Sequence, residues 1–187
     1  MEEIELYLED AKEHMEKAIA HLMTELSKIR AGKAMPSMLD GLMVDYYGSP
    51  TPIAQVASIN TPDARSLVIK PWEKNMLVEI EKAIQNSDLG LSPQNDGEII
   101  RLNIPVLTEE RRLGLVKQAK GEAEHGRISI RNIRKDANDS LKKLLKDGGA
   151  SEDEIKGAEG QVQDLTDKYV KQVDEIVGDK EADIMKV

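Results

Sequence analysis

Apolar residues recur every three or four positions along three long stretches of the chain, residues 2–30, 108–146 and 152–184. This period places them on one face of an α-helix, with polar residues on the other faces. The expected inward positions are Ile4, Leu8, Ala11, Met15, Ala18, Leu22, Leu26 and Ile29 in the first stretch, Val116, Ala119, Ala123, Ile130, Ile133, Ala137, Leu141 and Leu144 in the second, and Ile155, Ala158, Val162, Leu165, Tyr169, Val173 and Ile176 in the third. Three amphipathic helices of comparable length bury their apolar stripes together, so the pattern predicts a three-helix bundle.

Local signals mark the junction of the second and third helices. The loop "DGGASEDE" contains Gly148, a residue type that commonly ends a helix. Ser151 followed by Glu154 is the pattern of a capping box, which starts the next helix. We therefore expect a tight turn between two long antiparallel helices.

Three glycines lie inside the second predicted helix, at Gly114, Gly121 and Gly126. Each costs about 1 kcal/mol relative to Ala in a helix interior. We therefore expect close packing or local bending at these positions, and of the two we favour close packing.

The segment between the first two helices has a different character, with Pro, Gly and β-branched residues. Alternation and turn signals predict strands at 42–46, 53–59 and 66–70, a helix over 73–86, and a last strand in which Ile100, Leu102 and Ile104 face inward. This segment is predicted to form a small β/α/β domain, which makes the fold class α+β.

The predicted organisation is a bundle domain, residues 1–30 and 106–187, with the β/α/β domain, residues 31–105, inserted into it. The chain crosses between them twice, which suits a hinge and an elongated, bent molecule of two domains. The expected hinge residues are Ala31, Gly32, Ile104 and Pro105.

Composition narrows the class of protein. The chain has 187 residues, 40% of them hydrophobic and 33% charged, with no Phe and no Cys. The lack of Cys excludes disulfides, thiolate metal sites and a Cys nucleophile, and it fits a reducing compartment. The acidic, amphipathic start does not resemble a signal peptide, and no stretch is apolar enough to span a bilayer. We expect a cytoplasmic protein with no membrane partner.

Charge singles out the second helix. The formal net charge is −9, yet residues 108–146 hold more Lys and Arg than Asp and Glu, unlike the rest of the chain. On a helical wheel seven cations share an arc of about 100° beside the apolar stripe. This basic face comprises Lys117, Lys120, Arg127, Arg131, Arg134, Lys135 and Lys142.

Several interpretations of the basic face stay open from the residues alone. A charge run is most often a solvated helix face. However, the i,i+4 pairs of Arg131 with Arg127 and with Lys135 each destabilise a helix by about 0.2–0.5 kcal/mol, which favours a polyanionic partner. The main alternative is internal pairing with the acidic third helix, at the "SEDE" end or at Asp164 and Asp167. A membrane is disfavoured because the adjacent apolar face is needed for the core.

The kind of polyanion is also constrained. The scarcity of aromatic residues argues against a protein that stacks single-stranded bases on exposed rings. Arginines, in contrast, suit contacts with the phosphates of structured RNA. No catalytic constellation is found, and no metal or cofactor motif; His14, His21 and His125 are interpreted as lone surface histidines. Trp72 is expected to anchor the core of the small domain rather than contact a partner.

Seven stretches, in order and spread over the whole chain, resemble the bacterial ribosome recycling factor family. They are "IRAGKA", "LDGLMVDYYGSPTPIAQVASI", "KPWEKNMLVEIEKAI", "SDLGLSP", "IRLNIPVLTEERR", "RNIRKDAND" and "DKEADIMKV". The resemblance implies an L-shaped molecule with a three-helix bundle hinged to a β/α/β domain. It also implies a monomer without a catalytic site, a cofactor or a small-molecule substrate.

The resemblance implies a role after termination of translation, when the ribosome is split into subunits and released from messenger RNA together with elongation factor G, which hydrolyses GTP. The bundle would lie on the rRNA of the large subunit. Arg131 matches the arginine of the family's "RN" motif, and Lys135 stands where the family commonly has a second arginine after Arg134. The expected RNA-binding residues are Arg30, Lys33, Lys117, Lys120, Arg127, Arg131, Arg134 and Lys135.

A second hypothesis comes from a different class of protein, a helical scaffold that uses its basic face to bind an acidic protein. The two hypotheses differ in salt dependence. Binding to RNA weakens with a log–log slope of about −0.7 to −0.9 per phosphate neutralised, whereas hydrophobic scaffold contacts change little.

Overall fold

The structure is a computed structural model that describes residues 2–29 and 32–186. It divides into two compact units, Met1–Ala31 with Glu109–Val187 and Gly32–Thr108. We call these the bundle unit and the small unit. The predicted domains change at 30/31 and 105/106, close to the junctions of these units. The α+β fold class is confirmed, with three long helices and a small β domain.

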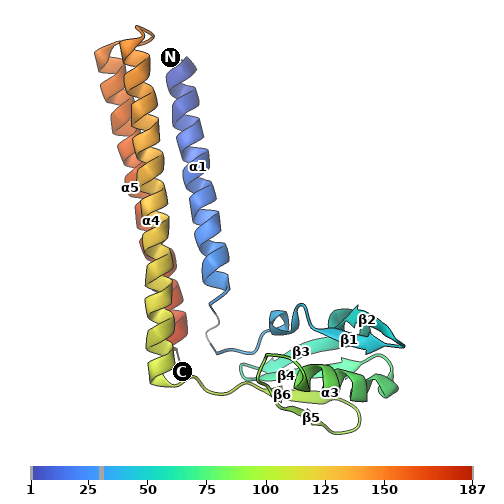
Figure 1. Cartoon of the computed structure of the whole chain (residues 1–187). Coiled ribbons are helices and arrows are strands. Elements are labelled where there is room, and N and C mark those ends of the chain that lie inside the picture. The colour runs from blue at the N-terminus through green and yellow to red at the C-terminus, as the bar shows by residue number, and fades with distance from the viewer. Residues whose placement is uncertain (1, 30–31, 187) are drawn as a thin grey trace. The chain divides into compact units, whose positions relative to one another are not determined.

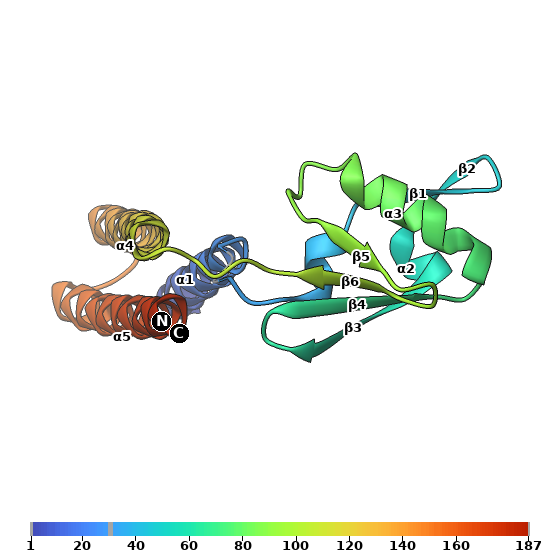
Figure 2. The same ribbon diagram turned by 90° about the horizontal axis from the view of Figure 1, so that it is seen from below.

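The bundle unit consists of three helices, α1 (Glu2–Ser27), α4 (Glu109–Lys146) and α5 (Glu152–Met185). Each contacts the other two. Helix α4 runs opposite to α1 and α5 (Figure 1), and a view along the helices places them at the corners of a triangle (Figure 2). The predicted three-helix bundle is therefore confirmed.

The turn between α4 and α5 forms as its residues indicate. Gly148 has a φ of +76°, and its N–H donates to the Leu145 carbonyl at 3.1 Å. The Ser151 hydroxyl accepts from the Glu154 N–H at 3.3 Å, and the Glu154 carboxylate accepts from the Ser151 N–H at 2.8 Å. These bonds satisfy backbone groups at both helix ends, and the predicted capping box is present.

The bundle core follows the predicted stripes with local shifts. Met15, Ile130 and Val162 are fully buried. In contrast, Val116 and Ile176 are only half-buried, and their neighbours Leu115 and Val177 are buried instead. The predicted positions are wrong by one residue there, because two adjacent apolar residues let the sequence pattern permit either register.

The prediction about the three glycines of α4 is right at one position only. A Cβ on Gly126 would lie 3.6 Å from Leu22 Cδ2, which is ordinary contact with α1. At Gly114 and Gly121 no atom lies within 4 Å of such a Cβ. Close packing therefore does not explain the glycines at these two positions.

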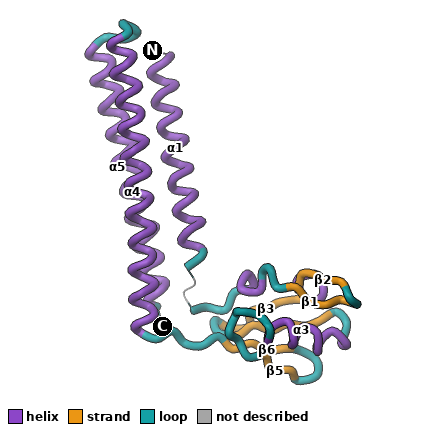
Figure 3. Tube along the Cα trace, in the orientation of Figure 1, coloured by secondary structure: helices purple, strands orange, loops and turns teal. Residues whose placement is uncertain are grey.

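The small unit contains two antiparallel sheets and several short helices. Figure 3 colours its strands orange and its helices purple. The elements are η1 (Pro36–Leu39), β1 (Met43–Tyr46), β2 (Ser49–Pro52), α2 (Ile53–Val56), β3 (Ala57–Asp63), β4 (Ser66–Pro71), η2 (Lys74–Met76), α3 (Leu77–Gln85), β5 (Pro93–Asn95) and β6 (Ile100–Asn103). The larger sheet has the order β3-β4-β6-β5, and β1 pairs with β2. Side chains of α3 and of the sheet form one core, including Ile69, Ile80 and Leu102.

Two predictions in the small unit are wrong. Residues 53–56 form the short helix α2 rather than the start of a strand, because the i,i+3 spacing of Ile53 and Val56 buries both side chains in the core. Trp72 is 68% exposed and does not anchor the core. The core is filled by aliphatic side chains of β4, β6 and α3, which leaves the indole outside.

Candidate nucleic-acid interface

The basic face lies on α4, beside the stripe of this helix that packs in the bundle. Ala119, Ala123 and Ile130 are buried, and they anchor this helix. The side chains of Lys117, Lys120, Arg131, Lys135 and Lys142 are exposed, whereas Arg127 and Arg134 are half-buried at the border with α5.

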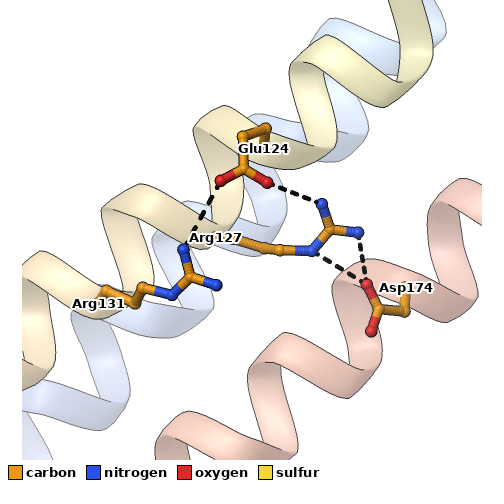
Figure 4. A network of polar contacts seen from close by, with 4 residues as sticks. All are labelled: Glu124, Arg127, Arg131 and Asp174. Atoms are coloured by element: carbon orange, nitrogen blue, oxygen red, sulfur yellow. Dashed lines mark hydrogen bonds and ion pairs between the residues drawn. The ribbon is translucent and has the colours of Figure 1, made fainter. Parts of the chain in front are cut away.

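Arg127 is held by two carboxylates (Figure 4). Its Nε and Nη2 both donate to Asp174 Oδ1 of α5, at 3.1 and 2.5 Å, and its Nη1 donates to Glu124 Oε2 at 3.1 Å. The hydrogen bonds that Arg127 donates to Asp174, and then the one that it donates to Glu124, raise the pKa of Arg127. Because the guanidinium already has three charge-assisted bonds, this residue ties α4 to α5.

Arg131 has a much weaker contact. Its Nη1 lies 3.6 Å from Glu124 Oε1, beyond hydrogen-bond distance, and both side chains are 52% exposed. Exposed pairs of this kind contribute about 0.2–1 kcal/mol. Arg131 can therefore exchange Glu124 for a phosphate with little loss.

Arg134 points along the border between α4 and α5. Its Nη1 donates to Gln163 Oε1 at 3.3 Å, and Gln163 in turn donates to Asp167 Oδ1 at 2.8 Å. Within the described part of the chain the Arg134 guanidinium bonds only to this one neutral partner, so most of its five N–H donors stay available for an anion.

The lysines of the basic face have no polar partner within the described residues. Neither an ion pair nor a hydrogen bond is formed by the side chains of Lys117, Lys120, Lys135 and Lys142. Lys117 and Lys135 are separated by about 27 Å along the helix axis, from the 1.5 Å rise per residue. The result is an extended row of free cations on a rigid helix, which suits a phosphate backbone.

The internal pairing expected as an alternative occurs, but with other partners. The "SEDE" carboxylate Glu154 caps its own helix, and Asp167 binds Gln163. The acid that reaches the basic face is Asp174, which the sequence reasoning did not name. Its role depends on the register between α4 and α5, and no local pattern in the sequence records that register.

Two further features of the outer surface of α4 were also missed. Leu113 and Ile128 are exposed large apolar side chains on this helix. Their exposure could have been predicted from the sequence, because both residues fall outside the apolar stripe of the helical wheel.

The two remaining predicted RNA-binding residues and the four expected hinge residues do not lie on α4. Arg30 and Ala31 lie outside the described residues. Lys33 belongs to the small unit and is half-buried, so the structure does not group it with the basic face. Gly32 has a φ of +73°, and the Ile104 N–H donates to the Arg65 carbonyl at 2.7 Å. Gly32, Ile104 and Pro105 all belong to the small unit.

Other kinds of site are not apparent in residues 2–29 and 32–186. No cluster of three or more His, Cys, Asp or Glu side chains there could hold a metal ion. In the same part of the chain, no helix is both long and apolar enough to cross a membrane.

Known proteins resemble this chain over its whole length. The family model for ribosome recycling factor matches residues 22–185. The ribosome-recycling factors of Cytophaga hutchinsonii and Amoebophilus asiaticus are 58% and 59% identical over 187 residues, covering 100% of both chains in each comparison.

Solved structures agree with these matches. A solution structure of the ribosome recycling factor is similar with a TM-score of 0.73 and 36% identity, covering 100% of both chains. A second similar structure comes from models for the T. thermophilus ribosome recycling factor and the E. coli elongation factor G bound to the E. coli post-termination complex. Its TM-score is 0.60 at 44% identity, covering 98% of this chain and 99% of that one.

Proposed function

Because the chain belongs to the ribosome recycling factor family, we propose that it splits the post-termination ribosome into subunits and so releases it from messenger RNA. Elongation factor G is the proposed partner, since the T. thermophilus relative occurs with this factor on the post-termination complex. The partner supplies GTP hydrolysis, and this chain acts by binding rather than by bond chemistry. Its place of action is the cytoplasm, where ribosomes work.

The basic face is the proposed contact with rRNA of the large subunit. The observation that carries this proposal is a row of lysines, Lys117, Lys120 and Lys135, that have no polar partner in residues 2–29 and 32–186. They lie next to the weakly paired Arg131. Arg131 and Arg134 offer planar donors that can bind a phosphate through two bonds. Arg127 acts mainly by holding α4 against α5.

The remaining predicted residues are close in the sequence to the two points where the chain passes from one unit to the other. Arg30 and Lys33 are proposed to add positive charge there. The pivot on the first crossing is assigned to Ala31 and Gly32. On the second crossing, the Ile104 N–H donates to the Arg65 carbonyl of the small unit. We therefore assign the pivot there to Pro105 and the residues after it.

The test is the splitting of purified post-termination ribosomes by this protein with elongation factor G and GTP, followed by light scattering. We expect Arg131→Glu to abolish splitting and large-subunit binding while helix content stays unchanged. Lys171→Glu is the matched control, because Lys171 is an exposed lysine of α5 outside the basic face and makes no polar contact within the described residues.

The outcomes separate the function from the site. No splitting by the unmodified protein with a matched elongation factor would refute the function. Splitting by Arg131→Glu at the normal rate would keep the function and refute the basic face as its RNA contact. Equal loss in both variants would indicate a general effect of charge.

A helical scaffold for an acidic protein is the second candidate, because the Arg127–Asp174 pair shows that the basic face does accept carboxylates. Salt dependence distinguishes the two. If Lys117, Lys120, Arg131 and Lys135 each neutralise one phosphate, the log–log slope of large-subunit binding is about −2.8 to −3.6. A slope near zero would favour the scaffold.

A further inference from the structure

The turn of the β1–β2 hairpin contains an unusual tyrosine. Tyr46 pairs with Ser49, so Tyr47 and Gly48 form a two-residue turn, with φ of +50° and +85°. Such turns favour Asn, Asp or Gly at the first position, since a side chain with a bulky Cβ substituent is strained there. Among the described residues, Tyr47 is the only non-glycine with a positive φ.

Burial does not compensate for this strain, because Tyr47 is 70% exposed. Strained backbone that is kept without a packing benefit is typical of functional positions. The side chain of Tyr47 is therefore the feature that needs an explanation, and its surroundings indicate one.

The ring of Tyr47 is held in place by polar bonds. Its hydroxyl donates to Glu73 Oε2 at 3.2 Å and accepts from Asn75 Nδ2 at 3.0 Å. The Tyr46 hydroxyl donates to the other oxygen of Glu73 at 3.4 Å, and the two rings lie edge to face with centroids 4.7 Å apart. Glu73 also raises the pKa of Tyr46, as expected for a nearby negative charge.

A third aromatic residue is next to this network in the sequence. Trp72 directly precedes Glu73 in the chain and is exposed. The sequence contains only one Trp, four Tyr and no Phe, so two of its five Trp and Tyr residues take part in this network. We name the set Tyr46, Tyr47 and Glu73 the aromatic corner.

The chemistry of the aromatic corner selects a cation. A carboxylate between two phenols repels phosphate, and the faces of exposed rings attract positive charge. The segment 31–107 also has more Asp and Glu than Lys and Arg. A guanidinium fits better than an ammonium, because it is planar, stacks on rings and donates two parallel bonds to a carboxylate.

We propose that the aromatic corner binds an arginine side chain presented by a basic segment of a partner protein. The guanidinium stacks on Tyr47 and pairs with Glu73. This interaction surface is on the small unit and does not depend on the proposed rRNA contact of the bundle unit.

The test uses the full chain and a short glycine–arginine peptide, with the matching glycine–lysine peptide as comparison, at about 0.15 M salt. Calorimetry measures affinity, and the fluorescence of Trp72, the only tryptophan, reports on the site. We expect the arginine peptide to bind at least about fivefold more tightly than the lysine peptide.

Three variants locate the interaction. Glu73→Gln keeps the hydrogen-bonding shape and removes the charge, and Tyr47→Asn places a residue suited to the turn. Both are expected to weaken binding of the arginine peptide at least about fivefold, and Tyr47→Asn is expected to keep the thermal midpoint or raise it. Glu98→Gln, an exposed residue of the β5–β6 turn, removes the same charge outside the aromatic corner and should bind normally.

Several results would overturn the proposal. Equal weakening by Glu98→Gln and Glu73→Gln would mean unspecific attraction to an acidic unit. Normal affinity in Glu73→Gln, together with a lowered midpoint in Tyr47→Asn, would mean that the network only pins the hairpin. Equal binding of the lysine peptide would remove the arginine assignment, and tighter binding of oligouridylate than of the arginine peptide would point to RNA.

Discussion

Replacing Asp174 by Asn tests the role of the Arg127 network in stability. The variant keeps the shape of the side chain and removes its charge, which lies 2.5 and 3.1 Å from two guanidinium nitrogens. Two unit charges at about 3 Å attract by about 1.4 kcal/mol in water, and exposed pairs contribute about 0.2–1 kcal/mol. Because the Arg127 side chain is 25% exposed and that of Asp174 57%, we expect a loss of about 1 kcal/mol.

The same change should strengthen binding to the large subunit. Without Asp174, Arg127 keeps only its contact with Glu124 and becomes available for a further phosphate. One more phosphate contact makes the log–log salt slope steeper by about 0.7–0.9, which corresponds to about five- to eightfold tighter binding at about 0.1 M salt. Stability and affinity are therefore expected to move in opposite directions.

Two assays measure these effects. Thermal unfolding followed by helix circular dichroism should show a midpoint about 4 °C lower, with a smaller difference in about 1 M salt, where the pair is screened. Affinity for the large subunit is measured at several salt concentrations. Glu175→Gln is the matched control, since Glu175 is an exposed carboxylate next to Asp174 with no polar partner in the described chain.

The reasoning is refuted by either of two results. If Asp174→Asn and Glu175→Gln have the same thermal midpoint, the pair contributes nothing to stability. If Asp174→Asn lowers the midpoint and leaves the affinity and the salt slope at the values of the control, Arg127 does not reach a phosphate.

Four other substitutions test local features of the fold. Gly121→Ala should raise the free energy of unfolding by up to about 1 kcal/mol, measured in urea, because the site is helical and open; a decrease would show an unrecognised close contact. Gly32→Ala should destabilise the small unit by about 1–3 kcal/mol, since φ is +73° and a Cβ would lie 2.7 Å from Leu107 Cγ; an unchanged near-ultraviolet melt would contradict this. Ser151→Ala should cost about 1 kcal/mol by removing the helix cap. The hydrogen bonds with Ser151 also lower the pKa of Glu154. The ionised Glu154 carboxylate therefore adds to the stability of the fold above about pH 4.3, and this stabilisation is lost as the pH falls through the lowered pKa. A stability difference between Glu154→Gln and the unmodified protein that persists at acidic pH would contradict this prediction.

The long helices could be predicted because each has a full-length apolar stripe with a 3.6-residue period, and the capping box at Ser151 is a local signal. The small unit was harder to predict. Strand β5 includes Pro93 and has only three residues, and it forms because β6 lies beside it. Residues 53–56 are helical because the core accepts Ile53 and Val56 on one side. Short elements depend on neighbours that are distant in the sequence.

The candidate site divides in the same way. The arc of cations on α4 follows from helical geometry and was predicted residue by residue. Which of these cations are free was not predictable, because Asp174 meets Arg127 only through the packing of α5 against α4. The exposure of Trp72 was likewise missed, since an indole fits a core or a surface equally well in a local pattern.

The sequence by itself determined the three amphipathic helices, the α+β class, the position of the inserted unit and the row of cations, because each depends on periodicity or charge along a continuous segment. The tertiary structure alone decided how those charges are used. It paired Arg127 with Asp174 and bonded Tyr47 to Glu73, and it left Lys117 and Lys135 without a polar partner among the residues that the structure describes. These outcomes depend on the register between elements that are far apart in the chain, and a few ångströms of that register separate an ion pair from a free charge.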